Sequence, residues 1–228
     1  MNEVVERKST AVASTYDNPF QAYGEQASQK SIVGTLLKFS KGDFLAGQDE
    51  DEVAVGTRFV ANMDEMLVGW IRWESNRPTD HVMGKVSDGY QAPRRNDLGD
   101  NDKAQWEVDS DGKPRDPWQF SNYLLMKGTG DDDSLYTFTS SSKGGLNALG
   151  DLCKAYGKAM RQRPTEYPVV AVGVGSYQHP NRDYGRIKFP TFEVVGWASK
   201  DVFADEATIV PGEDPEPAPA KKGAKARF

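Results

Sequence analysis

The strongest constraint on the fold is a single helical pattern, around Gly145 to Arg163, that lies between two groups of strand-like segments. Basic residues are enriched toward its C-terminal end, where the helix dipole favours them, and Pro164 ends the pattern. Apolar side chains recur through it at helical spacing: Leu146, Leu149, Leu152, Cys153, Tyr156 and Met160. The sequence therefore predicts one principal helix in a mainly β protein.

Runs of β-branched and aromatic residues predict the strands. Before the helix these runs are Ser31–Phe39, Val53–Ala61, Leu67–Glu74, Trp118–Met126 and Leu135–Thr139, and after it they are Tyr167–Val174 and Gly185–Trp197. A Gly/Asp-rich turn at residues 128–133 joins two of them and predicts a hairpin. Strand alternation places Trp70 and Arg72 on one face of their strand, opposite Ile71 and Trp73.

The remaining segments divide the chain into a domain and two tails. Residues 1–30 lack a sustained period and are predicted to form a flexible arm, and residues 201–228 are predicted to form a disordered tail because Pro, Ala and charge dominate them. The domain is then residues 31–200, with a long polar loop at residues 78–117. Loops of that length inside compact domains are uncommon and often carry function.

Charge is distributed unevenly along the chain. The net charge is −6, yet residues 143–163 hold five basic side chains against one acid, Asp151. Acids gather instead at residues 49–52, 97–116 and 131–133 and in the tail, which we interpret as solvated segments. Because nucleic-acid binding depends on where the charges lie, the negative total does not exclude it.

Enzymatic and metal-binding patterns are weak. The two histidines, His81 and His179, are far apart, Cys153 is the one cysteine, and the acids of the long loop do not fit an EF-hand. We therefore expect no catalytic residues, no metal and no cofactor, and we expect Cys153 to be a buried structural group. No apolar run is long enough to span a membrane and the N-terminal residues 1–7 have no hydrophobic signal region, so we expect a cytoplasmic protein.

The Ser/Gly-rich segment Ser140–Gly145 precedes the helix and has two interpretations. A serine there would cap the helix N-terminus. Alternatively, backbone amides and Lys143 would hold a phosphate of a bound strand. The order GxxxxGK[ST] of a phosphate-binding loop is missing.

Basic residues interleaved with aromatic residues on the predicted strands favour binding of single-stranded nucleic acid. Such strands are held by cations along the backbone and by aromatic faces on which bases stack. The alternative for any one aromatic side chain is a place in the core. The candidate binding residues are Lys38, Lys41, Arg58, Trp70, Arg72, Trp73, Tyr136, Phe138, Lys143, Arg186, Lys188 and Phe189.

The order of the elements resembles a known family. Strands from Ser31 to Glu74, a hairpin, a helix and then strands to Trp197 follow the order of the oligonucleotide-binding (OB) fold, a five-stranded Greek-key β-barrel whose helix lies between the third and fourth strands. In this order the chain resembles single-stranded DNA-binding proteins of phages and prophages. The resemblance implies a tail that recruits replication or recombination proteins, here ending in Phe228, although the four basic residues beside Phe228 depart from the acidic family pattern.

The sequence thus predicts a protein that coats single-stranded DNA without sequence preference during phage-type replication or recombination. We expect it in the cytoplasm of the bacterial host, and a homo-oligomer is compatible with this role. A structural or assembly protein of a virion is the main alternative. A hydrolase whose carboxylates converge only in three dimensions is a weaker one.

Overall fold

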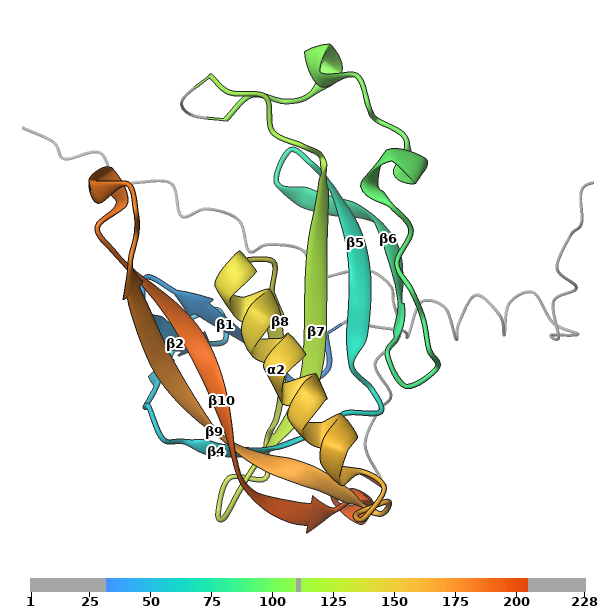
Figure 1. Ribbon diagram of the computed structural model, residues 1–228, viewed down its shortest axis with the longest axis vertical. Coiled ribbons are helices and arrows are strands. Elements are labelled where there is room, and N and C mark those ends of the chain that lie inside the picture. The colour runs from blue at the N-terminus through green and yellow to red at the C-terminus, as the bar shows by residue number, and fades with distance from the viewer. Residues whose placement is uncertain (1–31, 110–111, 205–228) are drawn as a thin grey trace, which may run out of the picture.

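The computed structural model describes residues 32–109 and 112–204 of the chain (Figure 1). The predicted N-terminal arm, most of the predicted tail and Phe228 lie outside these ranges. In chain order the elements are β1 (Thr35–Ser40), β2 (Asp43–Ala46), β3 (Asp51–Val53), β4 (Arg58–Ala61), β5 (Leu67–Glu74), β6 (Arg77–Lys85), β7 (Trp118–Gly128), β8 (Leu135–Ser140), α2 (Lys143–Ala159), β9 (Glu166–Gln178) and β10 (Arg186–Ser199). Four short 3-10 helices, η1 (Arg95–Leu98), η2 (Lys103–Gln105), η3 (Arg182–Tyr184) and η4 (Lys200–Phe203), lie in the connections.

The strands form one curled sheet, and this confirms a mainly β protein with one principal helix. Figure 1 shows the sheet as a half-barrel, with α2 between the long β9–β10 hairpin and the strands β5 and β7. All of the strand pairs are antiparallel except β1 with β8, which is parallel. The helix thus fills the concave side of the sheet.

Strand β7 is the junction of the sheet. One of its edges pairs with β8, and the other pairs with β5 over residues 118–123 and with β4 over residues 126–128. Strand β4 then continues the sheet to β9 and β10, whereas β5 continues it to β6. The sheet therefore divides at β7 into two branches, and the space between them is occupied by α2.

Two predicted segments differ from the structure. The run Val53–Ala61 is not one strand, because a turn at residues 54–57, with Gly56 at φ +90°, separates β3 from β4. The irregular loop begins after Lys85 and not at residue 78, because β6 pairs with β5 along its length. As an edge strand in which only Met83 is buried, β6 carries the polar residues typical of a loop.

The core joins the buried face of α2 to the sheet. Leu149, Leu152 and Tyr156 are buried against a cluster that runs from Leu37 to Phe203. Cys153 lies half-buried beside this cluster, with its Sγ 3.4 Å from the Sδ of Met66, and burial raises the pKa of its thiol. This agrees with the predicted structural role of the cysteine.

Ser142 caps the N-terminus of α2. Its hydroxyl accepts a hydrogen bond of 3.1 Å from the backbone N–H of Gly145, as the capping interpretation of this segment predicts.

Among the described residues, none of the helices has the length and apolar character that crossing a membrane requires.

Candidate functional site

Two hollows of the surface meet at Ser142, at the start of α2. The larger one, here called the hairpin groove, has a volume of about 880 Å³ and lies between the first turns of α2 and the β9–β10 hairpin. The smaller one, here called the strand pocket, has a volume of about 390 Å³ and lies over β1, β5, β7 and β8. Both are large enough for a small ligand.

Aromatic side chains line the hairpin groove. The rings of Tyr177 and Phe189, which come from paired strands, lie 6.2 Å apart. Phe189 packs so closely on the first turn of α2 that a Cβ at Gly144 would lie 2.7 Å from its own Cβ, so only glycine fits there. Tyr177 is 49% exposed and therefore offers the open aromatic face of the groove.

The cations of the hairpin groove have no acidic partners in the part of the chain that the structure describes. Lys143 and Lys188 line it, both are exposed, and neither forms an ion pair within the described residues. The side chain of Lys188 lies directly over Gly42, which brings it beside Lys41 in the turn between β1 and β2. The one acid in the lining, Asp151, pairs with Lys154 at 2.8 Å. Positive charge consequently dominates the groove.

The strand pocket combines an apolar lining with polar groups. Trp73, Phe39 and Ile71 are among its apolar side chains, and the turn at residues 140–142 contributes serines. Lys38 also lines it and pairs with Glu50 at 2.6 Å, and the hydrogen bond from Lys38 lowers the pKa of the Glu50 carboxyl.

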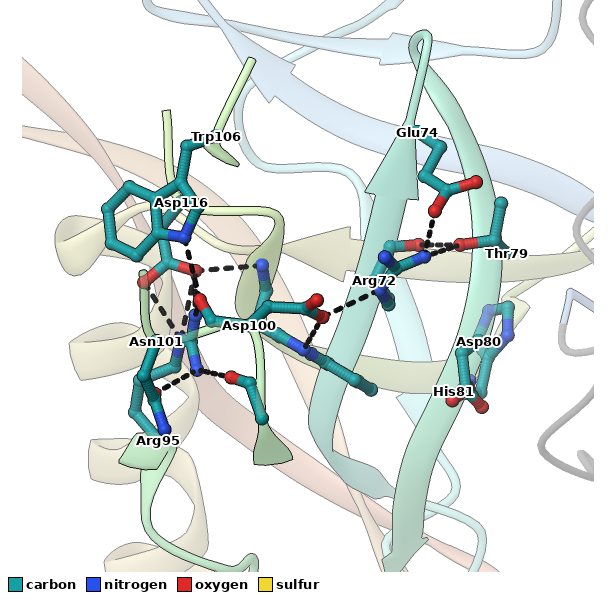
Figure 2. Close-up of polar contacts among 12 residues, drawn as sticks. Arg72, Glu74, Thr79, Asp80, His81, Arg95, Asp100, Asn101, Trp106 and Asp116 are labelled. Atoms are coloured by element: carbon teal, nitrogen blue, oxygen red, sulfur yellow. Dashed lines mark hydrogen bonds and ion pairs between the residues drawn. The ribbon is translucent and has the colours of Figure 1, made fainter. Parts of the chain in front are cut away.

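Arg72, a predicted binding residue, lies in neither hollow. Its guanidinium donates a hydrogen bond of 2.8 Å from Nε to Asp100 and also pairs with Glu74 (Figure 2). The hydrogen bond to Asp100 is the main reason that its pKa is raised, and the same bond lowers the pKa of Asp100. Asp100 belongs to the long loop and also accepts a hydrogen bond of 3.0 Å from the indole of Trp118. Arg72 of β5 and Trp118 of β7 thus anchor the loop to the sheet through Asp100.

Further ion pairs and indole hydrogen bonds stabilise the long loop. Arg95 and Asp116 form an ion pair of 2.7 Å, and the indole of Trp106 donates to the backbone carbonyl of Asp100 (Figure 2). The indole of Trp70, another predicted binding residue, donates to the backbone carbonyl of Pro93 at 2.9 Å. Trp70 thus holds the base of the loop.

We expect Asp100→Asn to loosen this loop. Asparagine lacks the negative charge of the carboxylate to which Arg72 and Trp118 donate. The backbone N–H groups of residues 94–107 should therefore exchange hydrogen faster in the variant at neutral pH. In the wild type the pKa of Asp100 is lowered, so its attachment is complete above about pH 4 and is lost as the pH falls through that lowered pKa. Asp97→Asn is the control, and equal exchange in the two variants would contradict the anchoring role.

Three other predicted residues take places away from the hollows. Phe138 is fully buried, so its predicted role in stacking on bases is wrong: both faces of β8 are covered there. Tyr136 is half-buried, with its hydroxyl donating to Asp132 at 3.0 Å and its ring against Phe59. Burial, and then Asp132, raise the pKa of Tyr136. Arg58 is exposed at the start of β4, outside both hollows.

The structure therefore brings together about half of the predicted set. Arg186 is a further predicted residue outside both hollows, at the start of β10 and opposite Gln178 in the β9–β10 hairpin. The predicted residues that line a hollow are Lys38, Trp73, Lys143, Lys188 and Phe189, and Lys41 adjoins them through Gly42.

Sequence reasoning missed Tyr177, Gln119 and Thr139. Tyr177 faces Ile187 across the β9–β10 hairpin, next to the pair of Ser176 with Lys188. Pairing the last two predicted strands through the turn at residues 179–185 would have placed Tyr177 beside that basic segment. Gln119 and Thr139 carried no sequence signal, because each is a single polar residue on a strand.

No family model, no curated protein and no solved structure matches the chain. Within the described ranges, no group of three or more His, Cys, Asp or Glu side chains could hold a metal ion. The hairpin groove presents lysine charge that has no acidic partner among the described residues, and the two hollows together present aromatic faces and hydroxyl groups. Such groups can bind a ligand that carries both phosphate groups and planar aromatic rings.

Proposed function

We propose that the chain binds single-stranded DNA along the hairpin groove and the strand pocket, on a barrel of the OB type. The observation that carries the proposal is the position of the two hollows relative to the strands. In the OB fold, oligonucleotides bind over the second and third strands and between the loops that follow the first and fourth strands.

The pairing of the strands supports this assignment. Taken as one interrupted strand, β4 and β5 are the first strand of the barrel and pair with both β7 and β9. Strands β7 and β8 are then the second and third, α2 follows, and β9 and β10 are the fourth and fifth. The additional strands β1 and β2 continue the sheet beyond β8, and Phe44 of β2 contacts Phe192 of β10 with ring centroids 6.2 Å apart.

In this assignment both hollows fall on the ligand-binding side of the barrel. Gln119 and Tyr123 of the second strand and Thr139 of the third line the strand pocket. The hairpin between the fourth and fifth strands supplies Tyr177 and Lys188 to the hairpin groove. The path between them crosses Ser142 at the N-terminus of a 17-residue helix, which favours phosphate.

The open aromatic face favours a single strand over a duplex. An unpaired base can stack on Tyr177, at about 1–3 kcal/mol per base, whereas a paired base already stacks on its neighbours. Lysines without acidic partners contact phosphates of any sequence. We therefore propose coating of single strands without a sequence motif, and, from the family resemblance, a role in phage-type replication or recombination.

The double variant Lys143→Gln/Lys188→Gln tests the groove. If each lysine neutralises one phosphate, the slope of log affinity against log salt should fall by about 1.4 in magnitude, and affinity at low salt should fall about tenfold or more. Fluorescence anisotropy of a labelled oligo-dT measures both quantities.

The control variant Lys158→Gln/Arg161→Gln removes the same charge from exposed positions outside both hollows. It should change the slope by less than half as much, because the total charge acts only through screened, long-range attraction. Equal effects of the two double variants would show that net charge, and not the groove, governs binding.

A further inference from the structure

We infer that the strand pocket takes one unpaired nucleobase of the bound strand and gives the protein a preference by base type. This inference rests on the proposed function. It concerns the choice among bases, whereas the hairpin groove explains attachment to the backbone.

The shape of the strand pocket suits a flat ring. Its volume of about 390 Å³ is at the small end of the range for ligand sites. Leu36, Phe39, Ile71 and Trp73 line it with apolar surface, against which a base can bury its faces.

Two polar side chains of the pocket have unused hydrogen-bonding capacity. The amide of Gln119 and the hydroxyl of Thr139 line the pocket, and neither side chain forms a hydrogen bond with another described residue. The indole N–H of Trp73 is likewise buried with no partner in the described part of the chain. Base edges carry the donors and acceptors that match an amide, a hydroxyl and an N–H group.

The pocket is also reached from the hairpin groove. Ser142 belongs to the lining of both hollows, so a strand that leaves Lys143 passes over Ser142 to the pocket mouth. Lys38 lines the same pocket with its side chain 38% exposed. Because Lys38 is paired with Glu50, the phosphate of the entering nucleotide stays near Lys143, which adjoins Ser142 at the pocket mouth.

Photocrosslinking tests where the bases lie. An oligo-dT that carries 5-iodo-deoxyuridine is bound to the full chain, irradiated and digested, and the crosslinked peptides are identified by mass spectrometry. We expect crosslinks to Trp73 or Phe39 in addition to Tyr177. Crosslinks to Tyr177 and Phe189 alone would overturn the base pocket and leave the proposed function standing.

Thr139→Val and Gln119→Leu test the preference at nearly constant side-chain size. Affinities are measured for dT, dC and dA homopolymers at one salt concentration. Each variant should weaken binding of the preferred homopolymer about three- to tenfold, the factor of one ordinary hydrogen bond, and change the least preferred one less than about twofold. Thr165→Val and Gln162→Leu, both exposed and outside the pocket, should change none of them.

A uniform change for all three homopolymers, or none, would overturn the inference. If the wild type binds no homopolymer at all, the proposed function fails and the base pocket fails with it. Unchanged melting temperatures establish that the variants are folded.

Discussion

Tyr177→Ala should weaken the binding of an oligo-dT by about five- to a hundredfold, because it removes the open stacking face of the hairpin groove. Tyr177 is 49% exposed and its ring contacts that of Phe189, so the free energy of unfolding should fall by only about 0.5–1.5 kcal/mol. Anisotropy titration at fixed salt measures the first quantity and urea unfolding measures the second.

Tyr177→Phe is the matched control. It keeps the aromatic face and loses only the hydroxyl, so its affinity should stay within about threefold of the wild type. If Tyr177→Ala binds as tightly as the wild type, bases do not stack in the hairpin groove and the aromatic half of the proposal is wrong.

Phe138→Ala should have the opposite effects to Tyr177→Ala: a large loss of stability and nearly unchanged DNA binding. This side chain is fully buried, and its ring centroid lies 5.0 Å from that of Phe192 and 6.0 Å from that of Phe44. Truncating a buried phenylalanine creates a cavity and costs about 3–5 kcal/mol of stability. Urea unfolding should show that loss, while the folded fraction at low temperature should bind DNA within about twofold of the wild type.

Phe138→Leu keeps most of the buried volume and should cost clearly less than the alanine variant. A folded Phe138→Ala protein with wild-type stability and lost binding would contradict the core position of this residue. It would also restore the stacking role that the sequence first suggested for it.

The elements with clear periodicity were predictable from the sequence. The helical stripe of Leu149, Leu152 and Tyr156 located α2, and β5 was predicted with the bounds that the structure shows, Leu67–Glu74. Edge strand β6 was missed because only Met83 in it is buried and it carries many polar residues. Exposure at an edge removes the apolar signal on which strand prediction depends.

The candidate site was only partly predictable, because contacts distant in sequence decide which charged residues are free. Arg72 pairs with Asp100, 28 residues away, whereas Lys143 and Lys188 meet no acid in the described part of the chain. Alternation along β8 could not separate Phe138 from Tyr136, since strand period gives faces and not what covers them. The strand pocket draws its lining from several strands, and single residues such as Gln119 and Thr139 therefore carried no pattern.

The most direct test of the account is titration of the full chain into a labelled oligo-dT of about 30 nucleotides, long enough for at least one site of the size common in OB proteins. The account predicts saturable binding that weakens steeply with salt, and clearly weaker binding of a duplex of the same length. An unchanged anisotropy at low salt and micromolar protein, or equal affinity for the single strand and the duplex, would contradict it.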